Sequence, residues 1–143
     1  MAPSPEPWTW KSRVDRVELG YILLVGTGGF LGSVARFLVS GLVHRLFPFT
    51  TFPYGTLVVN LLGCLLIGFL GGLLEIRQVL DPSQRAFVLI GVLGGFTTFS
   101  TFAYETLGLL HAAEFGRSLF NIGAHIVLGL GAAWLGYFWA QYV

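Results

Sequence analysis

The side chains best suited to chemistry are concentrated between Gly94 and Glu105, a segment that reads GGFTTFSTFAYE. It places hydroxyls and phenylalanines together inside a stretch that is otherwise apolar enough to cross a membrane. Phe99 and Phe102 are three residues apart, which on a helix puts both rings on one face. Because the edges of aromatic rings carry partial positive charge, such rings can face an anion. The segment therefore predicts a place where an anion contacts protein.

Two adjacent glycines, Gly94 and Gly95, open this segment. Glycine is a poor helix former, so the pair can let the backbone open at membrane depth. Open backbone is tolerated there only inside protein or against a water-filled cavity. For Phe96, a further three residues before Phe99, interhelical packing is the favoured interpretation.

Asn60 is the only strongly polar side chain in the apolar part of the second hydrophobic stretch. An asparagine in a membrane helix can hydrogen-bond to a neighbouring helix. It can also present its amide hydrogens to an anion. Both interpretations stay open from the residue alone.

The elements that must position these residues are membrane-spanning helices. Of the 143 residues, 55% are hydrophobic and 10% are charged, a composition typical of integral membrane proteins. Crossing about 30 Å of hydrocarbon takes roughly 20 helical residues. Four stretches qualify, with short polar breaks between them: Leu19 to Val43, Tyr54 to Leu74, Ala86 to Leu110, and Leu119 to Tyr142. We expect an all-α integral membrane protein of four transmembrane helices, with a break in the third, over residues 19–143.

Residues 1–18 differ from the rest, since they are rich in proline, tryptophan and charge. They lack the apolar core and cleavage site of a secretory signal, and we expect a flexible polar lead that could touch lipid headgroups. The single cysteine, Cys64, allows no intrachain disulfide and no thiolate metal cluster, and is interpreted as a packing residue. His44 and His111 are expected in loops, and their spacing to each other makes no metal site.

The formal net charge of the chain is only +1, which offers little electrostatic attraction to a polyanion. No nucleic-acid binding is therefore expected. Without the lead, the basic loop residues balance between the two sides, Arg77 and Arg85 against Arg45 and Arg117. Such balance permits insertion in both orientations, whereas the positive charges of the lead favour a cytoplasmic N-terminus.

The first stretch carries Gly28, Gly32 and Arg36 at successive steps of four residues. Small residues at this spacing let two helices approach closely. An arginine at this depth is costly unless it is paired or reaches the membrane interface. The interpretation from the residue alone is structural, with Arg36 tying a helix end to carbonyls or to a carboxylate.

Three motifs, in order, resemble the small fluoride channels of the Fluc or CrcB family. They are GGFLGSVARF at residues 28–37, YGTLVVNLLGCLLIGFLGG at 54–72, and GGFTTFSTFAYE at 94–105. The last stretch, LGLGAAWLG at 128–136, matches more loosely. The resemblance covers nearly all of residues 28–136.

The resemblance implies an antiparallel, dual-topology homodimer in the cell membrane, with two fluoride pores and a structural sodium ion between the subunits. Such a channel exports fluoride passively and protects the cell from its toxicity. The resemblance also implies roles for individual residues. Those that resemble pore residues are Asn60, Phe99, Ser100, Thr101 and Phe102; those that resemble vestibule residues are Arg36 and Glu105; and the sodium ligands would be the main-chain carbonyls of Gly94 and Thr97.

This sequence departs from the family pattern in its fourth stretch. Asn121 and His125 stand where the family usually has a tyrosine and a serine on the pore side. Because imidazole titrates near neutral pH, one hypothesis is that His125 lines the pore and makes conduction depend on pH. The alternative is a neutral histidine hydrogen-bonded between helices. Ala103 also replaces a serine that is common in the family.

Other functional classes fit the residues less well. A small four-helix multidrug antiporter would need a membrane-embedded carboxylate for proton exchange, usually early in the chain, and the first stretch has none. Glu105 is the only acid well inside the apolar stretches, and it lies towards the end of its helix. An enzyme is not expected, since no nucleophile and base are suitably spaced. A membrane assembly subunit would account for the small residues but not for the phenylalanines and hydroxyls.

Overall fold

The computed structural model describes residues 19–77 and 80–143, and over these residues every regular element is a helix. The expectation of a flexible lead at residues 1–18 lies outside the described residues. The helices are α2 (Leu19–Leu46), α3 (Tyr54–Arg77), α4 (Pro82–Arg85), the π-helix η1 (Ala86–Leu93), α5 (Gly94–Phe96), α6 (Phe99–His111) and α7 (Phe115–Ala140).

Four of these helical stretches are long and apolar enough to cross a membrane: α2, α3, the run from Pro82 to His111, and α7. The predicted four-helix membrane fold is therefore confirmed, and the third span is interrupted as expected. Two details were wrong, because His44 lies in the last turns of α2 and His111 ends α6. Hydropathy shows where the apolar stretch ends. The helix itself continues past that point, into polar residues, for as long as its backbone hydrogen bonds continue.

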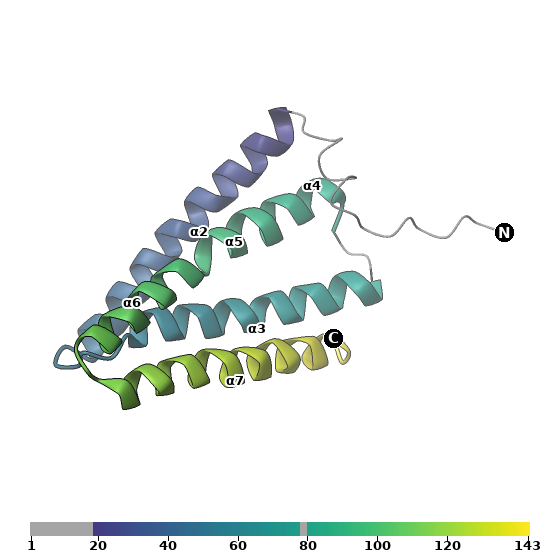
Figure 1. Cartoon of the computed structure of the whole chain (residues 1–143). Helices are drawn as coiled ribbons and strands as arrows, with labels where there is room; N and C mark the ends of the chain where they lie inside the picture. Colours follow the sequence, from purple (N-terminus) through teal and green to yellow (C-terminus); the bar gives the residue numbers. More distant parts are fainter. Residues whose placement is uncertain (1–18, 78–79) are drawn as a thin grey trace.

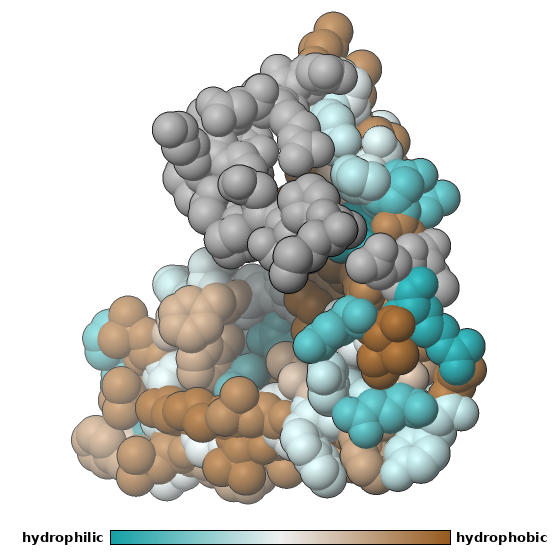
Figure 2. Space-filling view, turned by 90° about the vertical axis from the view of Figure 1, so that its right-hand side faces the viewer, coloured by the Kyte–Doolittle hydropathy of each residue, from teal (hydrophilic) through white to brown (hydrophobic). Residues whose placement is uncertain are grey.

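The four spans alternate in direction and form two pairs. α3 packs along α7, while α2 packs against η1 and α5. Figure 1 shows that the two pairs approach each other at the end that carries the 47–53 and 112–114 connections, and that they diverge toward the opposite end. In Figure 2, hydrophobic side chains dominate the lower left of the face, and hydrophilic ones are most frequent toward the right.

Small residues set how closely the helices approach. A Cβ atom on Gly32 would overlap the carbonyl oxygen of Val92 in η1, and one on Gly136 would overlap the carbonyl oxygen of Leu65 in α3. The predicted close approach at the glycines of the first span is confirmed. Helix backbones packed at this distance leave no room for side chains at the crossing. In lipid there is no hydrophobic driving force between helices, so van der Waals contact at such crossings helps to hold them together.

The break in the third span lies after the glycine pair rather than at it. Gly94 and Gly95 are helical, and the extended residues are Thr97 (φ −80°, ψ 157°) and Thr98 (φ −150°, ψ 112°). Gly95 serves close packing instead, because a Cβ atom there would lie against the backbone of Gly29 in α2. The predicted location of the opening was therefore wrong by a few residues.

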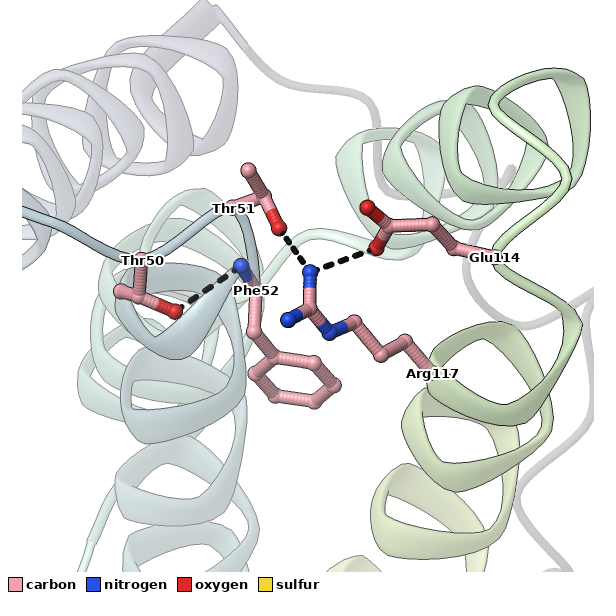
Figure 3. A network of polar contacts seen from close by, with 5 residues as sticks. All are labelled: Thr50, Thr51, Phe52, Glu114 and Arg117. Carbon is pink, nitrogen blue, oxygen red and sulfur yellow. Dashed lines mark hydrogen bonds and ion pairs between the residues drawn. The ribbon is translucent and has the colours of Figure 1, made fainter.

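A polar network connects the two loops at the end where the helix pairs meet (Figure 3). The guanidinium of Arg117 donates to Thr51 Oγ1 and to Glu114 Oε2, the latter at 2.7 Å. Close by, the rings of Phe52 and Phe120 pack with their centroids 5.3 Å apart. Since the ion pair is largely exposed, its contribution to stability is small, and the network chiefly fixes the start of α7 against the loop before α3.

Candidate functional site

A groove of about 950 Å³ runs between α3, the interrupted third span and α7. Six residues singled out from the sequence line it: Asn60, Gly94, Thr97, Phe99, Phe102 and His125. Ala103 also lines it, so the position where the family commonly has a serine contributes a methyl group here. The break in the third span thus brings together residues from three helices that are far apart in the sequence.

Asn60 binds the backbone of the break through both ends of its amide. Its Nδ2 donates to the carbonyl oxygen of Thr98 at 3.0 Å, and its Oδ1 accepts from the Thr98 N–H at 2.8 Å. Of the two interpretations that the sequence left open, the structure shows the hydrogen bond to a neighbouring span. Because the amide nitrogen carries two hydrogens, this pairing engages one of them, and Asn60 also lines the groove.

Thr98 is the site residue that the sequence reasoning missed. It is buried and is the N-cap of α6, where its Oγ1 accepts from the Thr101 N–H at 3.2 Å. The same hydroxyl donates to Thr101 Oγ1 at 2.9 Å and lies 3.4 Å from Ser100 Oγ. The available signal was a threonine preceding a helical run, since threonine is a favoured N-cap.

These bonds change the pairing of two carbonyls. In an uninterrupted α-helix the Thr98 N–H would donate to the Gly94 carbonyl, and the Thr101 N–H to the Thr97 carbonyl. Here the first donates to Asn60 and the second to the Thr98 side chain. Both carbonyls thereby lose their usual helical donors, and these are the two that were predicted as sodium ligands.

The phenylalanines form an aromatic wall of the groove. Phe99 is 78% exposed in the single chain. Its ring centroid lies 5.4 Å from that of Phe102, and Phe102 in turn lies 4.3 Å from the ring of His125. Phe96 is buried, which agrees with the packing role predicted for it. Two aromatic rings and an imidazole therefore line the groove beside Asn60 and Thr98.

Asn121 lies apart from this groove. It is fully buried, and its Nδ2 donates to Thr106 Oγ1 at 2.9 Å, whose hydroxyl donates to the carbonyl of Phe102 at 2.7 Å. Asn121 thus contacts α6 through Thr106. Within the described residues its Oδ1 has no hydrogen-bond partner.

Glu105 and Arg36 also lie outside the main groove. Glu105 Oε1 accepts from the buried Thr56 hydroxyl at 2.8 Å, which ties α6 to α3. Arg36 lines a separate hollow of about 460 Å³ on α2, together with Ser33, Ser40 and His44. The one ion pair between described residues joins Glu114 and Arg117, so no described carboxylate pairs with Arg36.

Ser100 and Thr101 are exposed at the start of α6 and reach the break through their contacts with Thr98. Neither is among the residues that line the groove. The hydroxyls of the break therefore form a connected set, with the buried Thr98 at its centre and the two exposed hydroxyls around it.

Comparison with known proteins gives consistent matches over most of the chain. The family model described as CrcB-like protein, Camphor Resistance (CrcB), matches residues 23–137. A protein of Sulfurovum sp. (strain NBC37-1), named fluoride-specific ion channel FluC, is 50% identical over 117 residues, which are 81% of this chain and 90% of that protein. A protein of the same name from Nitratidesulfovibrio vulgaris is 46% identical over 115 residues, 80% of this chain and 92% of that protein.

Proposed function

This chain belongs to the CrcB family, and on that premise we propose that it conducts fluoride passively across the membrane in which its four spans reside. It is a multi-pass membrane protein and a channel rather than an enzyme. In a cell such a channel lets accumulated fluoride leave down its electrochemical gradient and so protects against fluoride toxicity.

The observation that carries this proposal is the groove at the helix break, where amide, hydroxyl and aromatic groups converge. Fluoride is small and strongly hydrated, so a pore must replace its lost water with directed donors. Asn60 has a second amide hydrogen beyond the one bound to Thr98, and the edges of Phe99 and Phe102 add weaker positive charge. We expect these groups to contact the ion as it passes.

A second copy of the chain is proposed as the opposite wall of the groove, in an antiparallel homodimer with two pores. Asn60, Thr97 and Thr98 are among the residues that line the groove, and non-helical backbone at membrane depth must face protein or water rather than lipid. The balance of basic loop residues supports insertion in both orientations. Cross-linking of cysteines placed at opposite ends of α2 in two tagged copies tests the arrangement, and exclusively parallel pairs would contradict it.

A structural sodium ion is proposed between the subunits, held by the carbonyls of Gly94 and Thr97. The residues fit this ion, because sodium prefers oxygen ligands and both carbonyls have lost their usual helical donors. A bound cation would add positive charge beside the anion path. Dimer stability measured in sodium against the same concentration of a large organic cation tests the idea, and equal stability in both would overturn it.

Arg36 and Glu105 are proposed to act at the ends of the path, in the vestibule. Arg36 lines the hollow on α2, and its positive charge can attract anions there. Glu105 is bonded to Thr56 and does not line the main groove. Flux through Arg36→Gln at low ionic strength tests this role, and an unchanged rate would remove Arg36 from the path.

Fluoride efflux from liposomes tests the function directly. The purified protein is reconstituted in vesicles loaded with potassium fluoride, valinomycin is added to carry potassium, and release is followed with a fluoride electrode. Rapid fluoride release with little chloride release in the matched experiment is expected. Release that requires an imposed proton gradient would instead support the antiporter, and no release from verified dimers would support an assembly subunit.

A further inference from the structure

His125 has a defined tautomer, because its Nδ1 lies 2.9 Å from the carbonyl oxygen of Asn121 one turn earlier in α7. A carbonyl oxygen only accepts, so Nδ1 must carry a hydrogen and donate it. In the neutral ring the other nitrogen, Nε2, is then an acceptor with a lone pair. The hydrogen bond thus fixes the imidazole so that Nε2 is the nitrogen that can accept a hydrogen bond or a proton.

That nitrogen is buried and has no hydrogen-bond partner among the described residues. Buried acceptors are normally paired, and an unpaired one in a functional region calls for a ligand, a water or a proton. His125 lines the groove, and its ring packs against Phe102, one of the two phenylalanines expected to face the anion. The imidazole of His125 therefore belongs to the groove wall, and its Nε2 is the ring nitrogen left without a hydrogen bond.

No described acid faces His125 within the groove. The lining residues from α6 and the π-helix include Thr106, Leu107 and Leu89, and carry no titratable side chain among them. α3 contributes one titratable group, the thiol of Cys64. Glu105 of α6 bonds to Thr56 and lies outside the lining. A protonated His125 would therefore lack a fixed counter-charge, and the counter-charge that the site could admit is a mobile anion.

We propose that His125 Nε2 is a proton-linked binding position for a small anion, so that fluoride conduction rises as this nitrogen takes up a proton. Nε2 takes this proton from water, and no other covalent bond forms or breaks. With the proton on, Nε2–H donates to the anion beside Phe102, whereas the neutral ring presents a lone pair that repels it. This inference rests on the proposed function, because the anion in question is the conducted one.

The test measures fluoride efflux at equal internal and external pH, from about pH 5.5 to 8, the range in which histidine titrates. Protein-free vesicles at each pH give the background carried by hydrogen fluoride. Above its pKa a histidine loses protonation about tenfold per pH unit, so wild-type flux should fall by at least about tenfold across the range. His125→Ser should lose this dependence. His111→Ser is the matched control, since His111 is exposed at the end of α6, and it should keep the wild-type profile.

The outcomes separate this inference from the proposed function. A wild-type protein that releases fluoride at one constant rate over the pH range, or His125→Ser that keeps the wild-type dependence, would overturn the role of His125 and leave the channel intact. If the wild-type protein released no fluoride at any pH, the proposed function itself would be contradicted. Should the serine variant fail to form dimers, His125→Gln supplies an amide that does not titrate, and a flat profile is again required.

Discussion

Replacing Asn60 with alanine is expected to destabilise the break in the third span. The change removes both hydrogen bonds to Thr98 at once and leaves a backbone N–H and a carbonyl without partners at membrane depth. Side-chain hydrogen bonds between membrane helices contribute on average about 0.6 kcal/mol and at most about 1.7 kcal/mol each. Two bonds to one backbone residue therefore predict a loss of roughly 1 to 3 kcal/mol in unfolding free energy.

The matching substitution to aspartate adds a charge at the same position. A carboxylate still accepts from the Thr98 N–H, but its second oxygen has no hydrogen to donate to the Thr98 carbonyl and repels it. Because an ionised side chain at membrane depth is also costly, Asn60→Asp should destabilise the protein at least as much as Asn60→Ala. Its negative charge should also repel the conducted anion and lower flux more than alanine does.

Unfolding in mixed detergent micelles, followed by circular dichroism, measures stability, and fluoride efflux measures conduction. Ser100→Ala is the control for stability, because Ser100 is exposed and its hydroxyl lies 3.4 Å from its one neighbour in the break. An Asn60→Ala protein as stable as wild type would refute the bracing role of the amide. Undiminished flux in Asn60→Asp would leave Asn60 as a packing residue alone.

Three further substitutions examine other parts of the same framework. Phe102→Ile should nearly abolish fluoride efflux in a protein that still forms dimers, because the branched side chain has no electropositive ring edge; equal flux would remove the ring from the path. Thr56→Val should lower the unfolding midpoint, since Glu105 Oε1 would lose its 2.8 Å donor inside the protein; Thr27→Val, whose hydroxyl bonds only within its own helix, should cost less. Gly136→Leu should destabilise the protein by about 1 to 3 kcal/mol, as its side chain would meet the Leu65 carbonyl, and an unchanged midpoint would show that α3 and α7 can separate freely.

The four spans could be predicted because the length of an apolar stretch can be read directly from the local sequence. The exact location of the break could not, since it depends on partners from other helices. Gly95 has low helix propensity, yet it is helical, and its missing side chain lets α2 approach its backbone. The threonine at position 98 is extended because Asn60 and its own hydroxyl satisfy the groups that a helix would have used.

The fourth span shows the same limit for side chains. Asn121 and His125 are one helical turn apart and were expected on the pore side together, but the asparagine bonds to Thr106 and only the histidine lines the groove. A difference of one turn on a helix face is decided by how neighbouring helices rotate and cross. The rotation and crossing of helices depend on contacts between them, and these contacts cannot be read from a single sequence.

The interruption of the third span also gives the membrane interior two helix ends that face one another. α5 ends at Phe96 and α6 begins at Phe99. The carboxyl end of a helix carries partial negative charge and the amino end partial positive charge, each about half an elementary charge. A cation is therefore favoured on one side of the two extended threonines and an anion on the other. One bent span can thus offer electrostatic attraction to ions of both signs without placing a formal charge in the lipid.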